Sequence, residues 1–159
     1  MNDHELRTRV KALLHSQLYG VLATQGEGGA PHASIIAFSS ADDLSAIVFA
    51  TPRTTRKYAY MMARDRITFF IDDRRPRKEE IMDASGLEAQ GRVRELLGQE
   101  RDDYRAMFLA RRPDMASFVD APGSALMRLE VERYDMVDHF QHVLVLNIGG
   151  HTDYTGDKS

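Results

Sequence analysis

The chain contains no cysteine, and this absence removes several kinds of chemistry at once. Disulfides, thiolate metal sites and a cysteine nucleophile are all excluded. Long apolar runs are missing too, because nothing approaches the roughly 20 consecutive apolar residues that a membrane-spanning helix needs. The first residues are polar and lack the basic-then-apolar order of an export signal, so we expect the protein in the cytoplasm.

An excess of positive charge is also lacking. The 21 Lys and Arg residues stand against 24 Asp and Glu, which gives a formal net charge of −3. A general nucleic-acid binder needs the opposite balance, so we expect no nucleic-acid partner. With 159 residues, 43% of them hydrophobic, the chain suits a folded domain with one core. We expect this domain over residues 1–148 and a flexible polar tail over 149–159.

Short apolar segments separated by turn residues make up most of the chain. Seven of them have the length and the β-branched or aromatic content of strands. They are residues 19–24, 31–39, 44–51, 67–72, 87–97, 124–138 and 141–148. The glycines within 26–29 supply the positive-φ positions of a hairpin turn, and Gly91 indicates a β-bulge.

Helical patterns occur at a few places between these strands. Near the start, four apolar residues recur at helical spacing: Leu6, Val10, Leu13 and Leu14. We expect Asp3 to cap this helix and Gly20 to mark its end. Residues 58–63 and 100–111 give two further helices, and 114–118 adds a turn. The sequence therefore predicts a mainly β fold, a six- to seven-stranded antiparallel split β-barrel with about three helices.

The stretch 46–57 carries the clearest chemical signal. A strand is followed directly by hydroxyls and cations, and then by the start of a helix, whose unpaired N–H groups favour an anion. Thr54 and Thr55 add hydroxyl donors. Arg56 supplies a planar fork that matches two phosphate oxygens, and Lys57 supplies a point charge. These residues predict a phosphate site, although a threonine cap beside two solvated cations is an alternative interpretation.

The order of these motifs resembles the pyridoxamine 5′-phosphate oxidase superfamily. The matching stretches are 22–24, 31–36, 48–57 and 65–70. In that superfamily a strand ends in Thr, and a Ser/Thr-Arg-Lys triplet then opens a helix and holds the phosphate of FMN. The resemblance implies a split barrel and a homodimer with FMN at the subunit interface.

The resemblance also implies which residues hold FMN. The phosphate would be taken by residues of the strand end and the helix start, namely Thr51, Thr54, Thr55, Arg56 and Lys57. The isoalloxazine ring would lie along the backbone of one strand, at Ser34, Ile35 and Ile36.

The chain also departs from the true oxidases. They carry an Arg near Ser34 and a Lys near Ser39, and both are absent here. Their Arg-x-His motif has no counterpart in 126–133, and a flavin-contacting Gln is replaced around Gly86. The vitamin B6 reaction is therefore not expected. Residues 110–132 are more similar to the branch of haem-utilisation and general flavin-binding proteins.

We therefore expect an FMN-binding redox protein, an oxidoreductase of unknown substrate in which the flavin carries hydride or electrons. A binding protein that holds FMN or haem without turnover is the alternative, and a deazaflavin would suit the same phosphate site. A haem ligand would be sought among His139, His142 and His151. Residues three apart on a strand face opposite sides, so no metal site is expected at His139 and His142.

Overall fold

The computed structural model describes residues 1–77, 82–139 and 142–149. Its elements follow one another along the chain as α1 (Asp3–Ser16), β1 (Tyr19–Gln25), the 3₁₀ turn η1 (Glu27–Gly29), β2 (Pro31–Ser40), β3 (Ala46–Pro52), α2 (Arg56–Ala63), β4 (Arg66–Asp72), β5 (Gly86–Glu95), α3 (Gly98–Arg111), the 3₁₀ turn η3 (Pro113–Met115), α4 (Ala116–Val119), β6 (Ser124–Asp138) and β7 (His142–Asn147). The expected tail lies outside the described residues, apart from Gly149.

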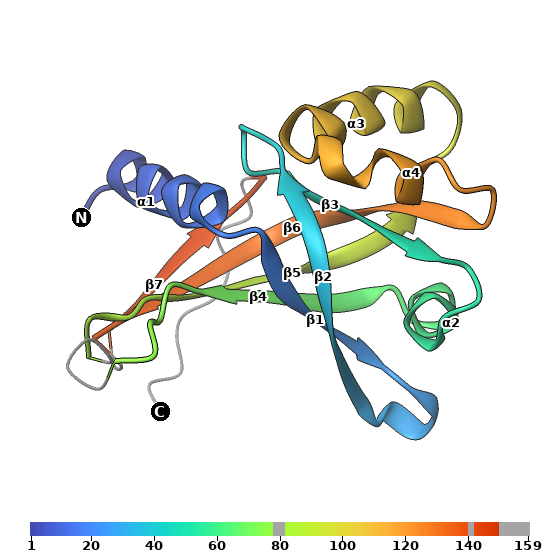
Figure 1. The fold of residues 1–159 in the computed structure, drawn as a ribbon. Coiled ribbons are helices and arrows are strands. Elements are labelled where there is room, and N and C mark those ends of the chain that lie inside the picture. Colours follow the sequence, from blue (N-terminus) through green and yellow to red (C-terminus); the bar gives the residue numbers. More distant parts are fainter. Residues whose placement is uncertain (78–81, 140–141, 150–159) are drawn as a thin grey trace.

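All seven strands form one antiparallel sheet in the order β3-β2-β1-β4-β5-β6-β7. Because β3 also pairs with β6, six strands close into a barrel, and β7 extends the sheet beyond it (Figure 1). This confirms the predicted mainly β antiparallel barrel. The prediction of about three helices was too low, since the described residues contain four. The expected turn near residue 114 is a 3₁₀ turn that continues into the short helix α4.

The barrel is split between β2 and β3. These strands pair only from Phe38 opposite Phe49 to Ser40 opposite Ile47. Continuing that register would place Ile36 opposite Thr51, but the ladder has already ended there. Residues 31–37 pair with β1 on their other side, so their β3 side forms an edge with no strand partner among the described residues, here called the open edge of β2.

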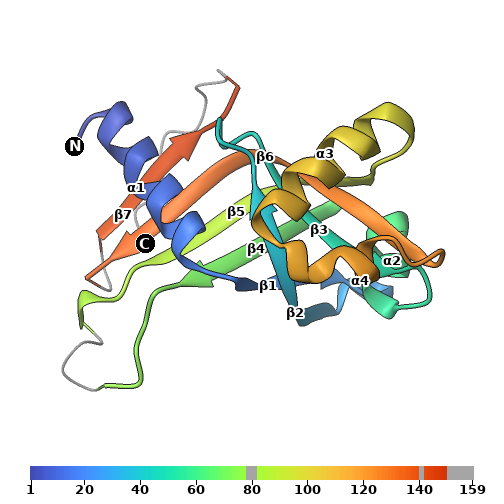
Figure 2. The same ribbon diagram turned by 45° about the horizontal axis from the view of Figure 1, so that its top comes forward.

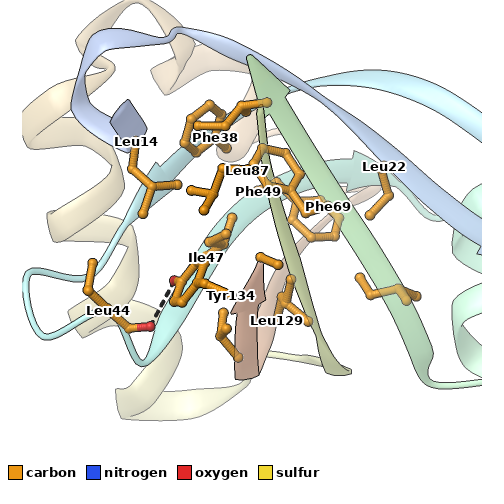
Figure 3. Close-up of a cluster of buried hydrophobic side chains, with 14 of the residues drawn as sticks. Leu14, Leu22, Phe38, Leu44, Ile47, Phe49, Phe69, Leu87, Leu129 and Tyr134 are labelled. Carbon is orange, nitrogen blue, oxygen red and sulfur yellow. Dashed lines mark hydrogen bonds between the residues drawn. The ribbon is translucent and has the colours of Figure 1, made fainter. Parts of the chain in front are cut away.

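The inward-facing side chains fill the barrel with a continuous apolar core (Figure 3). Phe38 and Phe69 lie with their ring centroids 4.7 Å apart. The hydroxyl of Tyr134, which is fully buried, donates a hydrogen bond of 2.8 Å to the carbonyl of Leu44. Burial raises the pKa of the Tyr134 hydroxyl, so this group stays a neutral donor.

The helices cover the ends and one side of the barrel. α1 and α2 lie at opposite ends, as both ribbon views show (Figures 1 and 2), and each adds apolar residues such as Leu14 and Met61 to the core. Phe108 of α3 and Val119 of α4 pack in a second cluster with Val48 of β3, on the outer face of the barrel. Within the described ranges, no helix is both long and apolar enough to cross a bilayer.

Local details differ from the sequence expectations at the ends of α1. Asn2, not Asp3, caps α1, and its side chain and that of Glu5 form a reciprocal capping box. The helix ends at Ser16, whereas Gly20 lies within β1, where a Cβ would come 2.2 Å from the Phe69 ring.

The bulge expected at Gly91 is confirmed. The register between β5 and β6 shifts between Gln90 and Gly91. A Cβ on Gly91 would lie 1.9 Å from the carbonyl oxygen of Glu130, so only glycine allows this close approach of the two strands.

Candidate functional site

The segment between β3 and α2 is held in shape by two threonines. Thr55 caps α2, because its Oγ1 accepts a hydrogen bond of 3.3 Å from the N–H of Tyr58. The same hydroxyl lies 2.9 Å from the carbonyl of Pro52 and 3.0 Å from Oγ1 of Thr51, which is fully buried. The hydroxyls of Thr51 and Thr55 are therefore hydrogen-bonded within the chain and fix the entry into the helix.

The remaining donors of this segment are free. The side chains of Thr54, Arg56 and Lys57 make no hydrogen bond or ion pair within the described part of the chain. Arg56 and Lys57 are the first two residues of α2, so their backbone N–H groups have no intrahelical acceptor. Two cations, a hydroxyl and two amides at the positive end of a helix form a donor set that fits a phosphate dianion.

Arg53, the third cation of this region, is already paired. Its Nε donates to Oε1 of Glu95 at 3.0 Å, and its Nη1 donates to the carbonyl of Pro122 at 3.2 Å. The hydroxyl of Tyr58 donates to the same Glu95 oxygen, also at 3.0 Å. The hydrogen bond to Glu95 raises the pKa of Arg53. The pKa of Tyr58 is also raised, chiefly by burial and then by its hydrogen bond to Glu95.

Glu95 was missed by the sequence analysis. It lies at the end of β5, far along the chain from Arg53, so no local motif joins the two. The sequence did hold one signal for it. Glu95 lies two residues after Val93 and four after Gly91, so the three share the inward face of the strand, and a carboxylate on that face predicts a polar or charged partner.

The predicted ring-contacting residues Ser34, Ile35 and Ile36 lie on the open edge of β2. Ile35 points outward and is 73% exposed, whereas Ile36 is buried in the core. The ring of His32 contacts Tyr60 of α2 edge-on, with centroids 5.6 Å apart. The structure therefore brings the open edge of β2 and the first turns of α2 together on either side of the split.

An apolar row crosses the outer face of the sheet beside this split. Val21 of β1 pairs with Ile35 of β2 on one side and with Phe70 of β4 on the other, and all three are exposed. Farther along, Phe70, Gly86 and Val137 help to line a cavity of about 370 Å³. Gly86 keeps room there, because a Cβ on it would come 3.0 Å from the Phe70 ring.

The candidate haem ligands lie at the other end of the sheet. His139 directly follows β6 and has a positive φ of 46°, and His142 is the first residue of β7. Nδ1 of His142 lies 3.0 Å from Oδ1 of Asp138, whose Oδ2 accepts a 2.8 Å hydrogen bond from Arg9. His151 lies outside the described residues.

Residues 6–138 match the family model for pyridoxamine 5′-phosphate oxidase. The chain belongs to this family. Among curated proteins, no sequence matches the chain significantly.

Several solved structures share the fold at low sequence identity. A haem-binding protein from Mycobacterium smegmatis superposes with a TM-score of 0.79 and 17% identity, over 89% of this chain and 57% of that one. Campylobacter jejuni ChuZ superposes with a TM-score of 0.77 and 13% identity, over 92% of this chain and 61% of that one. An FAD-binding protein from Mesorhizobium loti superposes with a TM-score of 0.66 and 16% identity, over 81% of this chain and 90% of that one. The chain thus spans less than two thirds of the length of the first two.

The departures from the oxidase pattern can now be placed in the structure. Ser34, in the region where true pyridoxamine 5′-phosphate oxidases carry an Arg, lies on the open edge of β2. Ser39, in the region of their Lys, is buried where β2 pairs with β3. Neither position supplies a charge.

Proposed function

We propose that the protein binds FMN and acts as a flavin-dependent oxidoreductase whose substrate is unknown. The observation that carries this proposal is the pair of cations at the N-terminus of α2, Arg56 and Lys57, whose side chains have no partner among the residues that the structure describes. In a chain that folds as this family does, such a donor set is the feature that a flavin mononucleotide needs for its phosphate.

The residues of the chain bind and orient, and the cofactor supplies the redox chemistry when bound. Arg56, Lys57 and the first amides of α2 hold the phosphate, with Thr54 beside them. Thr51 and Thr55 keep that segment in shape. The open edge of β2 at residues 34–36 offers backbone donors and acceptors to the ring. A deazaflavin with a phosphate would use the same donors.

We further propose that the protein acts as a homodimer through the outer face of the sheet. The row of Ile35, Val21 and Phe70 leaves apolar side chains exposed side by side, and such a patch favours association. A second copy on this face would also close the cavity at Gly86 and Val137.

An absorbance and fluorescence titration with FMN tests the proposal. We expect the wild-type protein to bind FMN, and the Arg56→Ala/Lys57→Ala variant to bind it about a hundredfold more weakly or worse, since two charge-assisted contacts are lost. Arg64→Ala removes a cation just past the other end of α2 and serves as the control with unchanged affinity. Equal affinity of the double variant and the wild type would overturn the proposal.

Haem binding is the second candidate, favoured by His142. Its Nδ1 contacts Asp138, so Nε2 is the ring nitrogen left to bind an iron, and the side chain is 61% exposed. Metal-binding histidines commonly have their other ring nitrogen held by a carboxylate in this way. One structural neighbour is named as a haem-binding protein, whereas another is named as an FAD-binding protein. Haemin titration of the wild type and His142→Ala decides this, with loss of the shifted Soret band expected only in the variant.

A further inference from the structure

Two polar atoms on β2 are buried without a hydrogen-bond partner. Nδ1 of His32 and Oγ of Ser34 are shielded from solvent, yet neither bonds to any described residue. They lie two residues apart on one strand and pair with Thr24 and Leu22 of β1, both buried, so they share the inward face. An orphaned buried polar atom costs folding free energy, so this pair needs a partner that the described residues do not supply.

The strand that carries the two orphaned atoms contacts the helix that carries the proposed phosphate donors. Both atoms belong to the open edge of β2, which has no strand on its β3 side. The His32 ring contacts Tyr60 of α2. Tyr60 follows Arg56 by four residues and Lys57 by three, which places these side chains on one side of the helix. His32 therefore contacts α2 one turn past Arg56, and Ser34 lies two residues farther along the strand where the ring is expected.

The chemistry of the two atoms fits a chain of hydroxyl groups. A neutral imidazole nitrogen and a serine hydroxyl can each pair with a group that both donates and accepts a hydrogen bond. In a flavin nucleotide, the ribityl chain between the phosphate and the ring carries such hydroxyls. We propose that His32 and Ser34 bind this chain and so recognise flavins by the linker as well as by the phosphate, an inference that rests on the proposed function.

A third orphaned atom supplies a matched control. Oγ of Ser40 is buried without a partner on the same strand and, six residues on from Ser34, on the same inward face. There β2 pairs with β3, opposite Ile47, away from the open edge. Ser40→Ala therefore removes the same kind of atom in the same element without touching the proposed site.

The experiment measures the affinity for FMN and for riboflavin, which lacks the phosphate, together with the melting temperature of the free protein. His32→Phe keeps an aromatic ring against Tyr60 and removes Nδ1, and Ser34→Ala removes the hydroxyl. We expect each substitution to weaken the binding of both flavins by about tenfold, because each removes one hydrogen bond. The melting temperature of the free protein should stay the same or rise, as in Ser40→Ala, because an unpaired buried atom is removed.

Other outcomes overturn the inference in distinguishable ways. Wild-type affinity in both variants would show that water partners these atoms, and a loss confined to FMN would place the contact on the phosphate. A melting temperature that falls together with affinity in both variants would indicate a purely structural role. If Arg56→Ala/Lys57→Ala weakens FMN while His32→Phe and Ser34→Ala do not, only this inference fails. If the wild type binds neither flavin, the proposed function fails and this inference falls with it.

Discussion

Glu95 lies at the end of β5 and accepts hydrogen bonds from Arg53 and Tyr58, on either side of Thr54 and Thr55. One half-buried carboxylate thus anchors both ends of the segment that enters α2. It also neutralises Arg53, so this cation does not compete with Arg56 and Lys57 for an anion. The geometry of the free donors therefore depends on a residue that does not touch the ligand.

Removing this carboxylate should disturb both stability and binding. In Glu95→Ala, the donors of the exposed Arg53 side chain and the partly buried Tyr58 side chain lose their acceptor, and we expect the free energy of unfolding to fall by about 1–2 kcal/mol. FMN affinity should fall as well, because the entry into α2 loosens. Urea denaturation and an FMN titration measure the two effects.

A surface carboxylate provides the comparison for Glu95. Glu132 pairs with Arg66, but both side chains are at least half exposed, so Glu132→Ala should cost well under about 1 kcal/mol. If the two variants lose the same small amount, the anchoring role of Glu95 is wrong.

At the scale of elements, sequence periodicity predicted the strands well because alternation on a half-buried surface is a local property. The bulge at Gly91 and the helix at 58–63 followed for the same reason. The sequence did not reveal the Glu95 anchor, the His32–Tyr60 contact or the Arg9–Asp138 pair, because each joins residues distant in the chain. The family resemblance assigns Thr51 and Thr55 to the phosphate, and the structure adds that their hydroxyls also hold the turn into α2.

The contact between α1 and the end of β6 should make stability depend on pH. Arg9 donates to the buried Asp138 and lowers the pKa of this carboxyl, assisted by His142 and opposed by burial. A group whose pKa is lower in the folded state stabilises the fold above its unfolded pKa, near 3.8, and loses this contribution as pH falls through the folded value. Asp138→Asn should therefore be less stable than the wild type at pH 7, with the difference shrinking below about pH 4.

Denaturation of the two proteins across pH 2–7 measures this difference. Asp3→Asn breaks an exposed ion pair with Arg7 and should show little change at any pH. A wild-type advantage that persists unchanged at the lowest pH would contradict the role assigned to Asp138.

At the scale of the whole molecule, the apolar row on the outer face of the sheet bears on assembly. If a second copy covers it, Ile35→Asp places a charge in the interface and should give a monomer by light scattering, with weaker FMN binding. Leu97→Asp changes a similarly exposed apolar residue away from this row and should remain a dimer. A wild-type monomer, or an Ile35→Asp dimer, would refute the proposed interface.

The central claim is that Arg56 and Lys57 hold the phosphate of a flavin. The most direct measurement is a calorimetric comparison of FMN with riboflavin on the wild type and on Arg56→Ala/Lys57→Ala. The account predicts that the wild type prefers FMN by about a hundredfold and that the double variant loses this preference. Equal wild-type affinities for the two flavins, or an undiminished preference in the double variant, would contradict it.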